Sequence, residues 1–121
     1  MSAAPFFPIL TTRDLGGLLG FYRDLLGFTV TYEFPGPDGE PGYVGLELGT
    51  SHLGIGRDPG LKDAPSSRFA LWAYVDDCDA TVERMRAAGV AVVDEPADQP
   101  WGERIARVLD PDGNTVILGQ R

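Results

Sequence analysis

The sequence has few of the side chains that metalloenzymes use: its 121 residues include one cysteine, Cys78, and one histidine, His52. A single cysteine excludes an internal disulfide and suits a reducing compartment such as the cytoplasm. Catalytic zinc and iron sites usually need about three protein ligands, with imidazole or thiolate prominent. We therefore expect no metal, no other cofactor and no catalytic residue, with a weak metal site at His52 and Glu47 as the open alternative.

Basic residues are also scarce, because ten Lys and Arg stand against eighteen Asp and Glu, for a formal net charge of −8. Nucleic-acid binding needs a basic surface, so we expect no nucleic-acid partner. No apolar run approaches the roughly twenty residues of a membrane span, so we expect no membrane contact. The first residues, Met-Ser-Ala-Ala-Pro, do not have the pattern of a signal peptide, so we expect a cytoplasmic protein. An acidic protein attracts cationic small molecules, although such a charge also serves solubility alone.

Apolar periodicity and turn residues predict eight strands and two helices. The first helix has an apolar stripe at helical spacing, formed by Leu15, Leu18, Leu19, Tyr22, Leu25 and Leu26. The second starts at Asp76-Asp77, ends at Gly89 and buries a stripe that includes Cys78, which is therefore expected to be an inert core thiol. The predicted strands are Phe6–Thr12, Thr29–Phe34, Tyr43–Leu48, His52–Gly56, Phe69–Val75, Val90–Val93, Ile105–Leu109 and Thr115–Leu118.

The order of these elements repeats, which indicates an internal duplication. Four pairs of residues at matching places in the predicted elements are 62 positions apart: Asp14 and Asp76, Gly27 and Gly89, Leu53 and Thr115, and Ile55 and Ile117. We expect one α+β domain over residues 1–121, made of two βαβββ modules at about 5–58 and 69–119 with a linker at about 57–68. One helix covers one face of each sheet, so the other face must find a partner or line a cleft.

The last two strands form a predicted hairpin that ends in a distinctive turn, Asp110-Pro111-Asp112-Gly113-Asn114. Pro111 presets φ for a turn, and Gly113 tolerates positive φ. With Trp101-Gly102 ahead of Arg104, this hairpin resembles the C-terminal hairpin of the vicinal-oxygen-chelate superfamily, which contains glyoxalase I, extradiol dioxygenases and bleomycin-resistance proteins. Three further segments near the start resemble the same superfamily: Arg13-Asp14-Leu15, Phe21-Tyr22-Arg23-Asp24 and Leu26-Gly27-Phe28.

The resemblance implies a glyoxalase/bleomycin-resistance fold, in which the two modules make a cupped eight-stranded arrangement that is paired or swapped in a homodimer. It also implies where enzymes of the superfamily would hold a divalent metal. Carried onto this sequence, those positions are Phe7, Ala70 and Ile117, with Gly54 or Ile55 as the fourth, and none of them has a donor side chain.

Strand alternation predicts which side chains face the cleft. Phe7, Tyr43, Glu47, Trp72 and Tyr74 fall on the face opposite the predicted core, although Phe7 and Tyr74 also suit packing within or between subunits. Trp101 lies in a Pro-Trp-Gly loop with little local core to join. His52, beside the turn, and Arg104, after the Trp-Gly pair, complete the predicted ligand-binding set.

These observations predict a metal-free protein that binds and sequesters a small planar compound, such as an antibiotic, and so confers drug resistance. Stacked aromatic rings favour a planar ligand, and the acidic chain favours a cationic one. A metal-dependent lyase, isomerase or dioxygenase with a non-standard site is the alternative. A subunit whose open face serves only dimer packing is a third interpretation.

Overall fold

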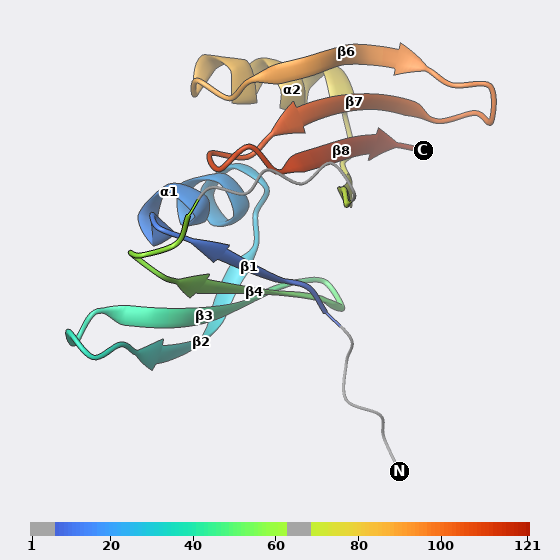
Figure 1. Cartoon of the computed structure of the whole chain (residues 1–121). Helices are drawn as coiled ribbons and strands as arrows, with labels where there is room; N and C mark the ends of the chain where they lie inside the picture. The colour runs from blue at the N-terminus through green and yellow to red at the C-terminus, as the bar shows by residue number, and fades with distance from the viewer. Residues whose placement is uncertain (1–6, 63–68) are drawn as a thin grey trace. The chain divides into compact units, whose positions relative to one another are not determined.

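The computed structural model describes residues 7–62 and 69–121, which belong to two units, Met1–Asp63 and Ala64–Arg121. Each unit has the order βαβββ and one four-stranded sheet (Figure 1), as the α+β prediction required. The first unit contains β1 (Ile9–Thr12), α1 (Leu15–Leu19), the π-helical η1 (Gly20–Leu25), β2 (Thr29–Pro35), β3 (Pro41–Leu48) and β4 (Ser51–Arg57). The second contains β5 (Leu71–Tyr74), α2 (Cys78–Ala87), β6 (Val92–Asp98), β7 (Arg104–Leu109) and β8 (Thr115–Gln120).

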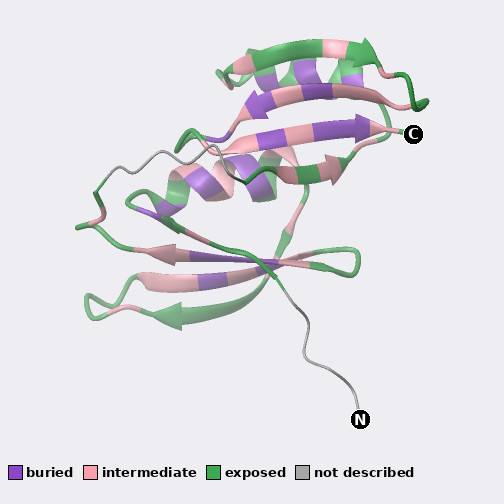
Figure 2. Cartoon of the chain, turned by 45° about the vertical axis from the view of Figure 1, so that its right-hand side comes forward, coloured by how far each residue is buried: buried purple, intermediate pink, exposed green. Residues whose placement is uncertain are grey.

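The two sheets share one topology. Their strand orders are β1-β4-β3-β2 and β5-β8-β7-β6, with a parallel pair between the first two strands and antiparallel pairs elsewhere. In each unit the helical segment follows the first strand, β1 or β5, which is at one edge of the sheet. It connects that strand to β2 or β6, which is at the other edge. Buried residues gather where the strands face the helix (Figure 2), and the alternate residues of each strand point to the opposite face, which we call the open face.

The helix that starts at Leu15 changes its winding after one turn. The N–H of Leu26 donates to the carbonyl of Phe21 at 3.0 Å, a five-residue step that is typical of π-helix. The wider turn brings Phe21 into the core, 1% exposed, and leaves Leu19 and Leu25 half-buried. The predicted stripe is therefore wrong at these positions, because it assumed a uniform helical period.

The duplication is present, but its spacing differs from the predicted 62. The helix N-caps are Asp14 and Asp77, which are 63 apart, and not Asp14 and Asp76. The extra residue of η1 restores 62 at Gly27 and Gly89, which have φ of 90° and 87°. Between the corresponding pairs Leu46–Leu53 and Val108–Val116, the β7–β8 hairpin has one residue more than the β3–β4 hairpin. The spacing therefore returns to 63, and the buried residues that correspond to Leu53 and Ile55 are Val116 and Leu118.

Several predicted boundaries are wrong. Phe69, expected in a strand and on its buried side, precedes β5 and is 80% exposed. The strand expected at Val90–Val93 is instead β6, Val92–Asp98, an edge strand with register shifts, where Pro96 is tolerated. The expected linker begins after β4, which extends to Arg57, and its residues 63–68 lie outside the described residues, as does Phe6.

Candidate ligand-binding site

The open face of the first sheet has a hollow of about 290 Å³. Four residues of the predicted ligand-binding set line it: Phe7, Tyr43, Glu47 and His52. Its other lining residues are Thr31, Tyr32, Gly45, Leu46 and Leu53. The hollow thus combines aromatic rings with one carboxylate and one imidazole.

The polar pair of this hollow is set by strand register. Glu47 and His52 are directly opposite each other across β3 and β4, which places the His52 Nδ1 3.4 Å from a Glu47 carboxylate oxygen. The Phe7 ring lies 6.2 Å from the His52 ring. Two potential donors therefore meet beside an aromatic ring, in a half-exposed position where a carboxylate can attract a cation.

A glycine allows Tyr43 to lie across this sheet. A Cβ on Gly54 would overlap the Tyr43 hydroxyl, would lie 2.9 Å from its ring carbon Cζ and would also crowd Ile9 at 3.1 Å. The Tyr43 ring in turn meets Tyr32 edge-on, with ring centroids 6.2 Å apart. Tyr32 is a lining residue that strand alternation alone did not select.

The open face of the second sheet carries a second aromatic group, which we call the Trp72 patch: Trp72, Tyr74, Trp101 and Glu103. The rings of Trp72 and Tyr74 are 5.8 Å apart, and their side chains are about half exposed, as is that of Trp101. Here too a glycine makes room, because a Cβ on Gly119 would lie 2.8 Å from the Trp72 Nε1. Trp72 therefore lies against the backbone of β8.

Glu103 links the members of this patch. The Tyr74 hydroxyl and the Trp101 indole N–H, at 2.7 Å, both donate to its carboxylate and hold the pKa of Glu103 below its ordinary value. Glu103 was not in the predicted set, although its position two residues before Ile105 on alternating backbone indicates the open face. Arg121 also joins, with its guanidinium carbon 4.0 Å from the centroid of the Tyr74 ring.

Arg104 lies away from this patch. It has the same strand parity as the buried Ala106, which directs its side chain to the helix face, where it donates to Asp79 of α2 at 2.8 and 3.0 Å. Asp98 accepts a third bond at 3.1 Å. Asp79 and Asp98 raise the pKa of Arg104, and the hydrogen bonds from Arg104 lower the pKa of Asp79. We therefore leave Arg104 out of the ligand-binding residues that we propose below.

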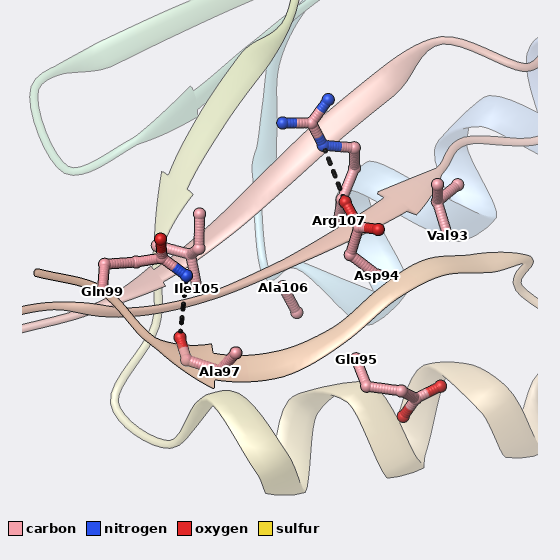
Figure 3. A pocket seen from close by; sticks show the side chains of 8 residues that line it. All are labelled: Val93, Asp94, Glu95, Ala97, Gln99, Ile105, Ala106 and Arg107. Carbon is pink, nitrogen blue, oxygen red and sulfur yellow. Dashed lines mark hydrogen bonds and ion pairs between the residues drawn. The ribbon is translucent and has the colours of Figure 1, made fainter.

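A further hollow of about 530 Å³ lies at β6 and β7. Figure 3 shows the Asp94 and Arg107 side chains pointing toward each other, with a separation of 3.4 Å between Arg107 Nε and Asp94 Oδ2. Glu95 points toward α2, where it pairs with Arg86. The sequence did not predict this hollow, because the expected strand ended at Val93 and β6 continues to Asp98.

The chain belongs to the Glyoxalase/Bleomycin resistance protein/Dioxygenase superfamily, whose family model matches residues 6–118. The resemblance of the two motif regions and the expected fold class are both confirmed by this match. The described residues contain no helix long and apolar enough to cross a membrane.

Among curated proteins, the chain is similar to the anthracycline biosynthesis protein DauV of Streptomyces sp. (strain C5), at 36% identity over 106 residues. That match covers 86% of this chain but 36% of DauV, so the chain spans about a third of that relative's length. The bleomycin resistance protein of Klebsiella pneumoniae is 28% identical over 93% of this chain and 89% of its own. The crystal structure of the bleomycin resistance determinant encoded on the transposon Tn5 has a TM-score of 0.69 at 26% identity, and 98% of both chains is covered.

The residues present do not fit the divalent-metal site that the superfamily's enzymes imply. The fourth metal-ligand position was expected at Gly54 or Ile55. Gly54 lies on the open face and Ile55 is fully buried in the core, and neither has a donor side chain. No group of three or more His, Cys, Asp and Glu side chains is close enough to hold a metal within residues 7–62 and 69–121. His52 and Glu47 supply two donors, one fewer than such sites usually have.

Proposed function

We propose that this protein binds a small planar compound, cationic and antibiotic-like, and sequesters it without chemical change, conferring resistance to that compound. The observation that supports the proposal is the grouping of exposed or half-buried aromatic rings with a carboxylate on the open face of each sheet. In the first unit the group is Phe7, Tyr43 and His52 with Glu47. In the second unit it is the Trp72 patch, with Glu103.

The physical chemistry of these groups favours a planar cation. Trp72, Tyr74 and Trp101 are 43%, 47% and 60% exposed, so a flat ligand can cover their apolar area. A well-stacked aromatic pair contributes about 0.5–1.5 kcal/mol beyond that burial. Glu47 and Glu103 add local negative charge, and the net charge of −8 attracts cations from solution.

The relatives support a role with antibiotics. One is named a bleomycin resistance protein and another an anthracycline biosynthesis protein. Both names concern antibiotics, and we transfer from them only the class of ligand. Sequestration in the cytoplasm needs no residue that reacts, which agrees with the buried position of Cys78 and the raised pKa that burial gives its thiol.

We also propose that the protein is a homodimer. Strands β2 and β6 are the outer strands opposite β1 and β5 in their sheets, and Tyr32, Phe34 and Val93 on them are more than half exposed. Edges and apolar patches of this kind are usually covered in globular proteins. Light scattering at micromolar concentration should give twice the 13.0 kDa chain mass; the monomer mass alone would contradict the proposal.

A metal-dependent lyase, isomerase or dioxygenase is the second candidate, and the His52–Glu47 pair is the observation that favours it. Elemental analysis of the purified protein separates the two functions. Stoichiometric metal, together with turnover of an α-hydroxythioester or a catechol, would support the enzyme. Binding of an antibiotic by metal-free protein would support sequestration.

The experiment that tests sequestration follows tryptophan emission while bleomycin, an anthracycline and other planar antibiotics are titrated into the protein. Trp72 and Trp101 are its only tryptophans, so quenching reports on the Trp72 patch directly. Trp101→Ala should weaken binding by roughly 1–3 kcal/mol, the cost of losing a buried aromatic contact. Phe69→Ala is the control, because Phe69 is 80% exposed and precedes β5. Failure of the wild type to bind any compound of the panel would refute the proposal.

A further inference from the structure

We propose that Tyr74, Glu103 and Trp101 form a subsite for the cationic group of the ligand, and that the guanidinium of Arg121 occupies this subsite within the chain until a ligand cation displaces it. The inference rests on the proposed function and adds two features to it. It names the part of the protein that recognises positive charge, and it identifies an internal competitor for that part.

The first observation is the position of Arg121. Its guanidinium carbon lies 4.0 Å from the centroid of the Tyr74 ring, which is within cation–π range. A group of the proposed ligand's chemistry is therefore already seated on this ring. The Tyr74 face is half exposed, so a cation from solution can approach it once Arg121 moves away.

The second observation is the carboxylate beside that ring. The indole N–H of Trp101 donates to Glu103 at 2.7 Å, and hydrogen bonding from the Tyr74 hydroxyl also lowers the pKa of Glu103. Both donors are neutral, so they orient the carboxylate and leave its negative charge for a cation. An aromatic face next to an oriented carboxylate is the combination that recognises a guanidinium or ammonium group.

The third observation is the difference between Arg121 and two other arginines. Arg57 is held by two bonds of 2.8 Å to Asp38, and Arg104 by bonds of 2.8 and 3.0 Å to Asp79. Arg121, in contrast, is seated on an aromatic face at an exposed position, where the Glu103 carboxylate attracts it by charge. A contact of that kind is weak enough for a ligand to replace, whereas a bidentate ion pair is stronger and geometrically more specific.

The position of Trp72 beside Tyr74 indicates where the rest of the ligand would bind. The Trp72 ring is 5.8 Å from Tyr74 and rests against Gly119, so it extends the aromatic surface along the open face. A planar ring can cover Trp72 while its cationic substituent reaches Tyr74 and Glu103. The ligand class is therefore a flat aromatic compound that carries an amidinium, guanidinium or ammonium group.

The test compares a planar cation, benzamidinium, with its neutral isostere, benzamide. Binding is followed by NMR on the two tryptophan indole N–H signals, in the whole protein. Arg121→Ala should tighten benzamidinium binding about two- to fivefold, the range for losing an exposed competing cation–π contact, and should leave benzamide binding unchanged. Arg84→Ala is the charge-matched control, because Arg84 is on the exposed side of α2. It should not tighten benzamidinium binding to the same degree.

Two more variants test the subsite itself. Glu103→Gln should weaken benzamidinium binding and leave benzamide binding nearly unchanged. The double variant that combines it with Arg121→Ala should lose most of the increase in benzamidinium affinity that Arg121→Ala gives alone. Thermal unfolding of each variant checks that the fold is intact. Equal tightening by Arg84→Ala, equal tightening for benzamide, or no benzamidinium binding to Arg121→Ala would overturn the subsite. Antibiotic binding in the separate titration would then still stand, so failure of the subsite and failure of sequestration are distinguishable.

Discussion

Gly119→Ala tests whether a glycine of β8 holds Trp72 in place on the open face. The new methyl carbon would lie 2.8 Å from the Trp72 Nε1 and 3.0 Å from Cε2 and Cζ2. Favourable carbon contacts are at about 3.5–4.0 Å, so the indole must retreat by about 0.5–1 Å. Because Trp72 is 43% exposed, it can rotate toward solvent without displacing the core.

The stability change should be small because two effects oppose each other. Overpacking usually lowers the free energy of unfolding by about 1–3 kcal/mol. Because the Trp72 ring is partly exposed and can move, we expect a cost near 1 kcal/mol here. Replacing glycine restricts the unfolded chain and returns about 0.4–1 kcal/mol. We expect Tm to fall by about 4 °C or less. A larger loss would mean that the indole cannot move.

The main effect should be optical and functional. In a Trp101→Phe background, Trp72 is the only emitter, and Gly119→Ala should shift its emission to the red, increase acrylamide quenching and weaken binding of planar ligands. Gly56→Ala on β4 is the control, because among residues 7–62 and 69–121 a Cβ there meets no heavy atom within 4 Å apart from its chain neighbours. Unchanged Trp72 emission and quenching in Gly119→Ala would refute this account of how the indole is positioned.

Three other outcomes are expected. Thermal unfolding with and without EDTA should coincide, and a drop of several degrees accompanied by stoichiometric metal would contradict the metal-free proposal. Hydrogen bonds from Arg104 lower the pKa of Asp79 from its ordinary 3.8, so the unfolded state binds more protons than the folded state below about pH 5. The free energy of unfolding in urea should therefore fall as the pH is lowered through that range, and Asp79→Asn should flatten the slope. Cys78 is fully buried, and burial raises its pKa, so its reaction with a thiol reagent should be slow until denaturant is added; fast labelling of native protein would refute this.

The sequence by itself determined the features that depend on neighbouring residues. The Asp110–Asn114 turn is one, since the Asp110 carboxylate accepts from the backbone N–H groups of Asp112 and Asn114 and Gly113 has φ of 87°. Strand alternation is another: it separated Val44 and Leu46 in the core from Tyr43 and Glu47 on the open face. Both follow from local backbone geometry, which the order of residues specifies directly.

Only the tertiary structure decided the features that depend on distant partners. The offset between the units falls from 63 to 62 at the extra residue of η1 and returns to 63 at the longer β7–β8 hairpin, and neither change alters the hydrophobic pattern enough to be seen in advance. The sequence placed Arg104 in the ligand-binding set because it follows the Trp-Gly pair. In the structure its side chain instead pairs with Asp79, which is 25 residues away. Glu103 gained its role in the same way, from Tyr74 on another strand. An ion pair or a hydrogen bond between elements joins residues that are far apart in sequence. The spacing of residues along the chain does not determine which of several possible partners a side chain contacts.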